Sequence, residues 1–200
     1  MSVLGVYNPL NIELDHGDGV YLYSTDGTRY LDFTSGIGVT SLGHSHPSLV
    51  NALKTQGEKI WHCSNLFKIT GQEMAAKKIV KNSFASNVFF CNSGAEAVEA
   101  GVKVVRKYFN SQNLNKYKII CAKNSFHGRT YAAISSSGKS KLTEGFEPIL
   151  AGFEQVDFND IDDLKKKIDN ETAAIMIETV QGEGGIVPAE KSYLRELQKL

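Results

Sequence analysis

The chain has 200 residues, which is enough for one domain with a sizeable core or for one domain and part of another. Lysine and arginine together number 22, as do aspartate and glutamate, so the formal net charge is zero. A neutral balance excludes a general attraction to nucleic acid or to anionic membranes, and any recognition by charge must therefore be local.

The sequence shows no targeting signal, and this observation and the cysteine pattern favour the cytosol. No apolar run approaches the ~20 residues of a membrane-spanning helix, and the N-terminus lacks the basic-then-apolar pattern of a secretory signal. The three cysteines, Cys63, Cys91 and Cys121, are far apart and form no C-x-x-C pair, which argues against a disulfide framework or a zinc–thiolate site. Cys91 and Cys121 end apolar runs, so we expect both to be small buried side chains.

The first part of the chain predicts a hairpin and two helices. Residues 19–36 alternate aromatic and polar side chains around Asp26-Gly27, which is typical of a hairpin turn. Pro47 suits the first turn of a helix, and residues 71–84 show a helical pattern. The side chains of this second helix expected to face inward are Met74, Ile79 and Val80.

From residue 88 onwards, short apolar runs alternate with helical patterns. The expected strands are 88–91, 118–122 and 173–177, and the expected helices are 97–109 and 160–168. Continuous apolar strands that alternate with helices predict an α/β fold with a mainly parallel sheet covered on both faces. The predicted organisation is an N-terminal segment, 1–62, followed by the α/β domain, 63–200.

The turn Asn92-Ser93-Gly94-Ala95 joins the first of these strands to its helix and admits two interpretations. In a capping box, Ser93 caps the helix and Glu96 reaches back. In an anion site, free amides beside the Ser93 hydroxyl hold a phosphate, with no bulky side chain in the way. A Glu96 carboxylate would repel that phosphate unless it pointed away, and the motif alone favours the capping box. The glycine patterns of the P-loop and of the dinucleotide fingerprint are absent.

Two further loops follow expected strands. Around Gly128, an aromatic side chain, Phe126, could stack on a planar ring, and the fork of Arg129 matches a carboxylate. After the strand 173–177 come Glu178 and a glycine-rich loop with Gln181 and Glu183. Each loop has an ordinary alternative, a solvated surface loop in the first case and a tight glycine turn in the second. The convergence of three strand ends at one edge of the sheet favours a ligand site.

The sequence resembles a known family at these residues. The stretches "LGHSHPSLVNAL", "CNSGAEAVEAGVKVVRKY", "SFHGRT" and "IETVQGEGGIVPA" occur in the order found in class III, pyridoxal phosphate-dependent aminotransferases of fold type I. Within that family the likeness is closest to the acetylornithine aminotransferases of arginine biosynthesis. The resemblance implies a cytoplasmic homodimer with its active sites at the subunit interface, and residues 1–62 would form part of the small domain.

The resemblance also implies roles for individual residues. Ser93, Gly94 and Ala95 would hold the phosphate of pyridoxal 5′-phosphate, and Glu178 would lie near this cofactor. Phe126 would stack on the pyridine ring, and Arg129 would bind the substrate α-carboxylate. Glu183 would match an acid that pairs with a C-terminal arginine and moves when a second carboxylate is bound. The turn around His44 and His46 would be structural, so no metal site is predicted.

Two residues that the family chemistry requires are expected beyond Leu200. These are the lysine that forms a Schiff base with the cofactor and the aspartate against the pyridine nitrogen. The pattern of Tyr193, Leu194, Leu197 and Leu200 stops without a helix cap, so we expect the front part of a longer protein, inactive alone. The implied reaction converts N-acetylornithine and 2-oxoglutarate to N-acetylglutamate semialdehyde and glutamate. Alternatives are another class III ω-aminotransferase, acting on ornithine, succinylornithine or 4-aminobutyrate, or a non-catalytic cofactor-binding module.

Overall fold

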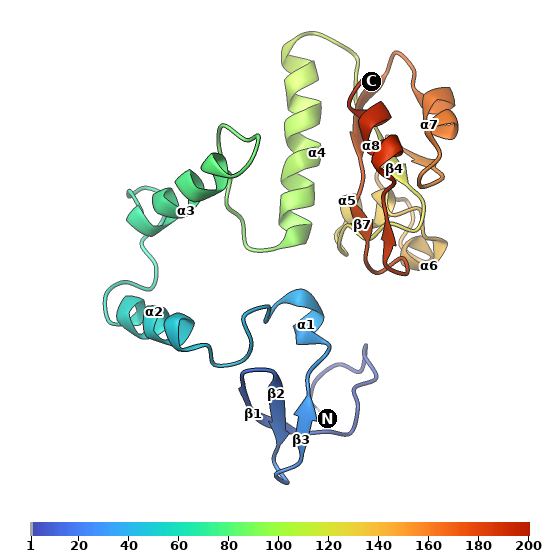
Figure 1. Cartoon of the computed structure of the whole chain (residues 1–200). Coiled ribbons are helices and arrows are strands. Elements are labelled where there is room, and N and C mark those ends of the chain that lie inside the picture. The colour runs from blue at the N-terminus through green and yellow to red at the C-terminus, as the bar shows by residue number, and fades with distance from the viewer. Residues whose placement is uncertain (1) are drawn as a thin grey trace. The chain divides into compact units, whose positions relative to one another are not determined.

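The computed structural model describes residues 2–200 and contains two compact units, Met1–Lys81 and Asn82–Leu200 (Figure 1). Each unit has its own secondary structure. The boundary between residues 62 and 63 that the sequence suggested concerns the domains of the complete family fold, and it stays a prediction.

The first unit begins with a three-stranded antiparallel sheet, in the order β1-β2-β3. The strands are β1 (Leu14–Asp18), β2 (Tyr21–Ser24) and β3 (Arg29–Leu31). The predicted hairpin turn at Asp26-Gly27 is confirmed, because it joins β2 to β3. The Asp26 carboxylate accepts hydrogen bonds from the Ser24 hydroxyl at 2.5 Å and from the Thr28 amide at 3.0 Å, which fixes the turn.

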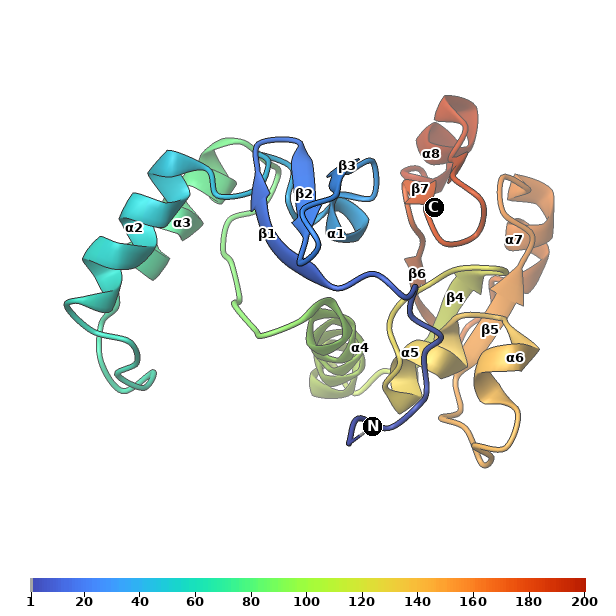
Figure 2. The ribbon, with the colours of Figure 1, turned by 90° about the horizontal axis from the view of Figure 1, so that it is seen from below.

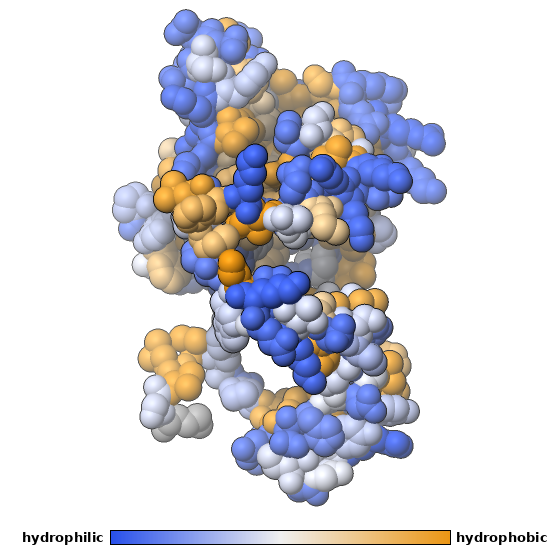
Figure 3. All heavy atoms as spheres, turned by 90° about the vertical axis from the view of Figure 1, so that its left-hand side faces the viewer, coloured by the Kyte–Doolittle hydropathy of each residue, from blue (hydrophilic) through white to orange (hydrophobic). Residues whose placement is uncertain are grey.

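Three helices complete the first unit: α1 (Ser35–Gly38), α2 (Pro47–Gly57) and α3 (Thr70–Lys81). Pro47 lies in the first turn of α2, as predicted. The prediction that Met74, Ile79 and Val80 face inward is wrong for Met74 and Ile79, which are 59% and 45% exposed, whereas Val80 is half-buried. Helical periodicity indicates which face is apolar and not what covers it. Exposed hydrophobic residues, in orange, are also visible on the face of the molecule that Figure 3 shows.

The second unit is built on a parallel sheet with the strand order β5-β4-β6 (Figure 2). Its strands are β4 (Lys118–Ala122), β5 (Phe153–Val156) and β6 (Thr172–Met176). The predicted parallel α/β sheet is thus confirmed, with β4 at its centre. A separate antiparallel pair, β7 (Val180–Gln181) and β8 (Val187–Pro188), follows β6.

Helices cover both faces of this parallel sheet. On one face lie α4 (Gly94–Ser111) and α5 (Tyr131–Ser136), and on the other lie α7 (Ile161–Lys167) and α8 (Lys191–Leu197). A short helix, α6 (Ser140–Thr143), follows α5. The buried core residues are Val102, Ile119, Cys121 and Ala132 on the first face and Ile120, Val156, Leu164 and Tyr193 on the second. None of the helices among residues 2–200 combines the length and apolar character needed to cross a bilayer.

The segment 88–91 differs from its prediction. It forms no strand, and Phe89 is 77% exposed. A strand needs a neighbour that accepts and donates its backbone hydrogen bonds, and no such neighbour lies beside this segment in the described chain. Cys91 is accordingly exposed, which overturns its predicted burial, whereas Cys121 is buried in the centre of the sheet as expected.

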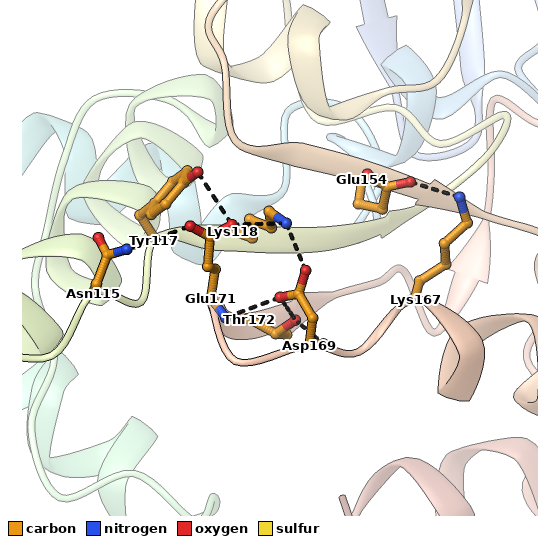
Figure 4. A network of polar contacts seen from close by, with 8 residues as sticks. All are labelled: Asn115, Tyr117, Lys118, Glu154, Lys167, Asp169, Glu171 and Thr172. Carbon is orange, nitrogen blue, oxygen red and sulfur yellow. Dashed lines mark hydrogen bonds and ion pairs between the residues drawn. The ribbon is translucent and has the colours of Figure 1, made fainter.

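A polar network closes the amino-terminal end of the sheet (Figure 4). The Lys118 ammonium at the start of β4 lies 2.6 Å from the Asp169 carboxylate and 2.9 Å from that of Glu171. Asn115 and Tyr117 donate hydrogen bonds to Glu171 as well. Two carboxylates around one ammonium favour its charged form, so the pKa of Lys118 is raised. The network ties the loop before β6 to the start of β4.

Replacing Lys118 by methionine should lower the Tm at pH 7 by a few degrees at most, because the ion pair of Lys118 with Asp169 is partly exposed. Lys118 holds the pKa of Asp169 below its usual range, so this carboxylate contributes stability above its unfolded pKa of about 3.9. That contribution is lost as the pH falls through the lower folded-state pKa. The Tm difference between wild type and variant should therefore shrink in acid, whereas a constant difference would contradict this account. The exposed Lys141 provides the control, Lys141→Met.

Candidate functional site

The first part of the candidate site is the start of α4. Ser93 has extended backbone angles, φ −154° and ψ 163°, and its hydroxyl accepts a hydrogen bond from the Glu96 amide at 3.2 Å. The Glu96 carboxylate accepts one from the Asn92 amide at 2.6 Å. This reciprocal pair is a variant of the capping box that the motif alone favoured, because Glu96 accepts from the amide of the residue before the cap. Glu96 therefore reaches back toward Asn92.

The capping box uses only part of the donor capacity of this turn. The amides of Gly94 and Ala95 donate to no group within residues 2–200. A Cβ added at Gly94 would meet nothing within 4 Å, so no distant segment of residues 2–200 crowds the side-chain position of this residue. Two free donors at a helix N-terminus favour a negatively charged ligand. The two interpretations of the turn can hold together because they involve different amides.

The second part is the loop after β4, which packs directly on the start of α4. Gly128 has φ +117°, and a Cβ added there would lie 2.8 Å from the Ala95 Cβ. Only glycine allows so close an approach in this conformation. Phe126 and Arg129, on either side, are both exposed, and Phe126 retains 37% of its accessible area. The aromatic ring and the guanidinium thus belong to a loop that packs on the first turn of α4.

The third part, the segment after β6, contacts the second. The Glu178 carboxylate accepts a hydrogen bond from the Phe126 amide at 3.2 Å. Burial raises the pKa of Glu178, while this hydrogen bond and the positive charge of Lys139 act in the opposite direction. The buried Gln181 amide donates to the Lys123 carbonyl at 2.8 Å. Three segments that are far apart in the sequence therefore meet at the carboxyl ends of β4 and β6.

Glu183 lies in the same glycine-rich loop and has a partner that the sequence did not reveal. Its carboxylate, 56% exposed, forms an ion pair with the ammonium of Lys139, whose side chain is 17% exposed. Lys139 lies in a serine-rich stretch without a recognisable motif, and only the tertiary structure brings it to the loop. Lys123, the residue after β4, is exposed and pairs with Asp157 at 2.8 Å.

Two histidines, His127 and His44, lie in different environments. His127 is buried, its Nε2 has no partner within the described chain, and burial lowers its pKa, which favours the neutral ring. In the first unit, the His44 Nε2 lies 2.8 Å from the Asp32 carboxylate. Residues 2–200 contain no group of three side chains placed to bind a metal ion.

Comparison with known proteins identifies the family. The family model described as "Aminotransferase class-III" matches residues 5–200. The acetylornithine aminotransferase of Agrobacterium fabrum is 50% identical over 190 residues, which cover 94% of this chain and 48% of that protein.

Solved structures show the same fold. The ornithine aminotransferase of Toxoplasma gondii superposes with a TM-score of 0.92 at 30% identity, covering 99% of this chain and 47% of that one. The N-acetylornithine aminotransferase of Stenotrophomonas maltophilia K279a gives a TM-score of 0.80 at 36% identity, covering 96% and 48%. The chain thus spans about half the length of these relatives. The predicted fold type I architecture is confirmed, and the chain belongs to the class III aminotransferase family.

Proposed function

We propose that the whole protein is a pyridoxal 5′-phosphate-dependent aminotransferase that transfers the amino group of N-acetylornithine to 2-oxoglutarate. The products would be N-acetylglutamate semialdehyde and glutamate, in arginine biosynthesis. The observation that carries this substrate assignment is the 45–50% identity, over nearly the entire chain, to several acetylornithine aminotransferases. The chain covers half of those proteins, so the activity is proposed for the whole protein and not for these 200 residues.

The start of α4 would hold the cofactor phosphate. The amides of Gly94 and Ala95 have no other acceptor, and the Ser93 hydroxyl can donate its hydrogen while its oxygen serves the helix cap. A doubly charged phosphate would meet two oriented donors and the positive end of an 18-residue helix. Bound there, pyridoxal phosphate supplies the electron sink that amino-group transfer requires.

The loop after β4 would place the ring and the substrate. The packing of Gly128 on Ala95 supports this placement, in which Phe126 would stack on the cofactor ring. Arg129, one residue beyond Gly128, would bind the substrate α-carboxylate through its planar fork. Glu178 would keep the loop in place, since it accepts from the Phe126 amide. The lysine and the aspartate that complete the chemistry would follow Leu200.

The whole protein would be a cytoplasmic homodimer. Support comes from large apolar side chains that the first unit leaves exposed, such as Leu53 at 75%, Trp61 at 91% and Phe67 at 67%. Apolar surface on this scale is typical of regions that another chain, or another part of the same chain, covers. Sedimentation of the whole protein would measure the oligomeric state, and a monomer at micromolar concentration would contradict this part of the proposal.

A second candidate is an ornithine aminotransferase, which the TM-score of 0.92 to the Toxoplasma gondii enzyme favours. Identity argues against it, at 30% for that structure and 50% for the Agrobacterium fabrum protein. A panel of amino donors separates the two. With 2-oxoglutarate as acceptor, N-acetylornithine should give a higher kcat/KM than ornithine, succinylornithine or 4-aminobutyrate. A preference for ornithine would overturn the substrate assignment while leaving the reaction class, and no transfer with any donor would overturn both.

A further inference from the structure

A second cavity lies in the second unit, away from the candidate active site. It has a volume of about 540 Å³, which suits a small molecule, and it is lined by α4 and by the segment that leads into β4. Lys107 in its lining follows Ala95 by 12 residues, roughly 18 Å along the helix from the candidate phosphate donors. Tyr117, also in the lining, precedes β4, so the cavity lies toward the amino-terminal end of the sheet.

The lining of this cavity has an excess of positive charge. Its cationic side chains are Lys103, Arg106, Lys107 and Lys116. Its only carboxylate among residues 2–200 is that of Glu99, which accepts a hydrogen bond from the Ala132 amide at 3.3 Å. No carboxylate in the described chain lies within 4.0 Å of any of the four cationic groups. In a chain of zero net charge, such a local excess favours an anionic ligand.

The helix dipole does not explain these cations. Basic side chains are favourable in the last turn of a helix, where the partial charge is negative. The last turn of α4 contains none, and Lys103, Arg106 and Lys107 all precede it. Lys103 and Lys107 are also four residues apart, a spacing at which like charges on a helix repel. The cluster therefore costs the free protein stability that a bound anion would restore.

Arg106 is held in place by groups at the start of β5. Its Nη2 donates to the Ala151 carbonyl at 2.6 Å, and its guanidinium carbon lies 5.6 Å from the centre of the Phe153 ring. Gly152 has φ +94°, and a Cβ added there would lie 2.6 Å from this Nη2, so glycine leaves room for the guanidinium. The buried Nε has no acceptor within residues 2–200. A positive charge is thus fixed beside the cavity without a carboxylate to neutralise it.

The other wall combines a cation with apolar surface. The Lys116 ammonium lies 5.7 Å from the centre of the Phe109 ring. Leu114, Leu150 and the ring of Tyr117 provide apolar lining, and Tyr117 is anchored by its hydrogen bond to Glu171 in the network of Figure 4. A ligand that suits both parts carries several negative charges next to an aromatic or aliphatic group.

We propose that this cavity binds a small organic polyphosphate of nucleotide size. Its phosphates would meet the lysines and Arg106, since ammonium and guanidinium groups are the usual protein partners of phosphate. Its aromatic or aliphatic part would cover the apolar lining. The cavity uses none of the residues that would hold pyridoxal phosphate, so this inference does not depend on the proposed function.

Titration calorimetry of the whole protein, with its cofactor bound, tests the site. The probe is ATP in magnesium-free buffer at about 0.15 M salt. ATP should bind once per chain with a Kd below about 1 mM, and adenosine should give no measurable binding. Inorganic triphosphate should bind at least about fivefold more weakly than ATP, because it has nothing to cover the apolar lining.

Paired lysine variants locate the binding. Lys103→Gln/Lys107→Gln should raise the Kd for ATP at least about tenfold, because two of the cations are gone. Lys77→Gln/Lys81→Gln is the matched control: it also removes two lysines four residues apart on a helix, and neither lines the cavity. Its Kd should stay within about twofold of wild type. Lys103→Arg/Lys107→Arg keeps the charge and should stay within about threefold.

The outcomes that would overturn the proposal are equally specific. These are the absence of saturable ATP binding up to about 5 mM, and the same Kd in both glutamine double variants. Triphosphate that binds as tightly as ATP would overturn the assignment of an organic ligand. Amino-group transfer is measured in a separate assay, so a protein without this activity would contradict the proposed function and leave the ATP result standing.

Discussion

Replacing Gly128 by alanine should destabilise the second unit by about 2–4 kcal/mol and weaken cofactor binding at least tenfold. Two costs combine at this position. The backbone has φ +117°, where a side chain is strained, and the new Cβ would lie 2.8 Å from the Ala95 Cβ and 3.3 Å from the Ala133 Cβ. Both neighbours are short side chains on helices, which cannot rotate out of the way. The loop must therefore move off the start of α4.

Gly145 provides the matched control for this prediction. It also has a positive φ, +80°, but a Cβ added there would meet nothing within 4 Å. Gly145→Ala should therefore show the backbone cost alone, about 1 kcal/mol, and leave cofactor binding unchanged. In the Gly128→Ala background, Ala95→Gly removes the nearest atom of the clash and should recover part of the lost stability.

Chemical denaturation and cofactor titration of the whole protein measure the two effects. Gly128→Ala with wild-type stability and affinity would show that the loop does not depend on contact with Ala95. Loss of stability with unchanged cofactor affinity would contradict the assignment of Phe126 and its loop to the cofactor site.

The sequence pattern predicted those elements whose hydrogen bonds or apolar surroundings depend on residues near them in the chain. The apolar run 118–122 is β4, the centre of the sheet, and the helical pattern 97–109 lies within α4. The capping residues of α4 were also legible, since Ser93 and Glu96 interact within one turn. For the helix cap, the hydrogen-bond partners are close together in the sequence. For the strand, an apolar run is sufficient because both faces of the sheet are covered.

The features that the sequence did not predict depend on partners from distant segments. Segment 88–91 has the composition of a strand, but pairing requires a neighbour that composition does not identify. The ion pair of Lys139 with Glu183 joins residues 44 positions apart, and neither side chain indicates the other. The third predicted strand end is absent, because segment 88–91 forms no strand. The meeting of the ends of β4 and β6 could be predicted, because parallel topology places carboxyl ends on one edge. Which side chains touch there could not.

Replacing Ile120 by alanine should destabilise the second unit by about 3–4 kcal/mol. Ile120 is fully buried in β4, the central strand, and packs with Val156 and Leu164 from the elements around it. Truncation removes apolar contacts and leaves a cavity between the sheet and the helices. The close-packed neighbours can relax only partly to fill this cavity. Ile149→Ala provides the control, because Ile149 is 40% exposed and should cost about 1 kcal/mol.

The functional readout of this variant separates the scaffold from the site. Ile120 faces the layer of α7 and α8, whereas the candidate site uses the start of α4 and the loops beyond the strand ends. At a temperature where both proteins are folded, Ile120→Ala should therefore keep the wild-type KM for both substrates while its denaturation midpoint falls. A raised KM at full folding would mean that the position of β4 controls the ligand loops. The sheet would then set site geometry through its packing as well as through its topology.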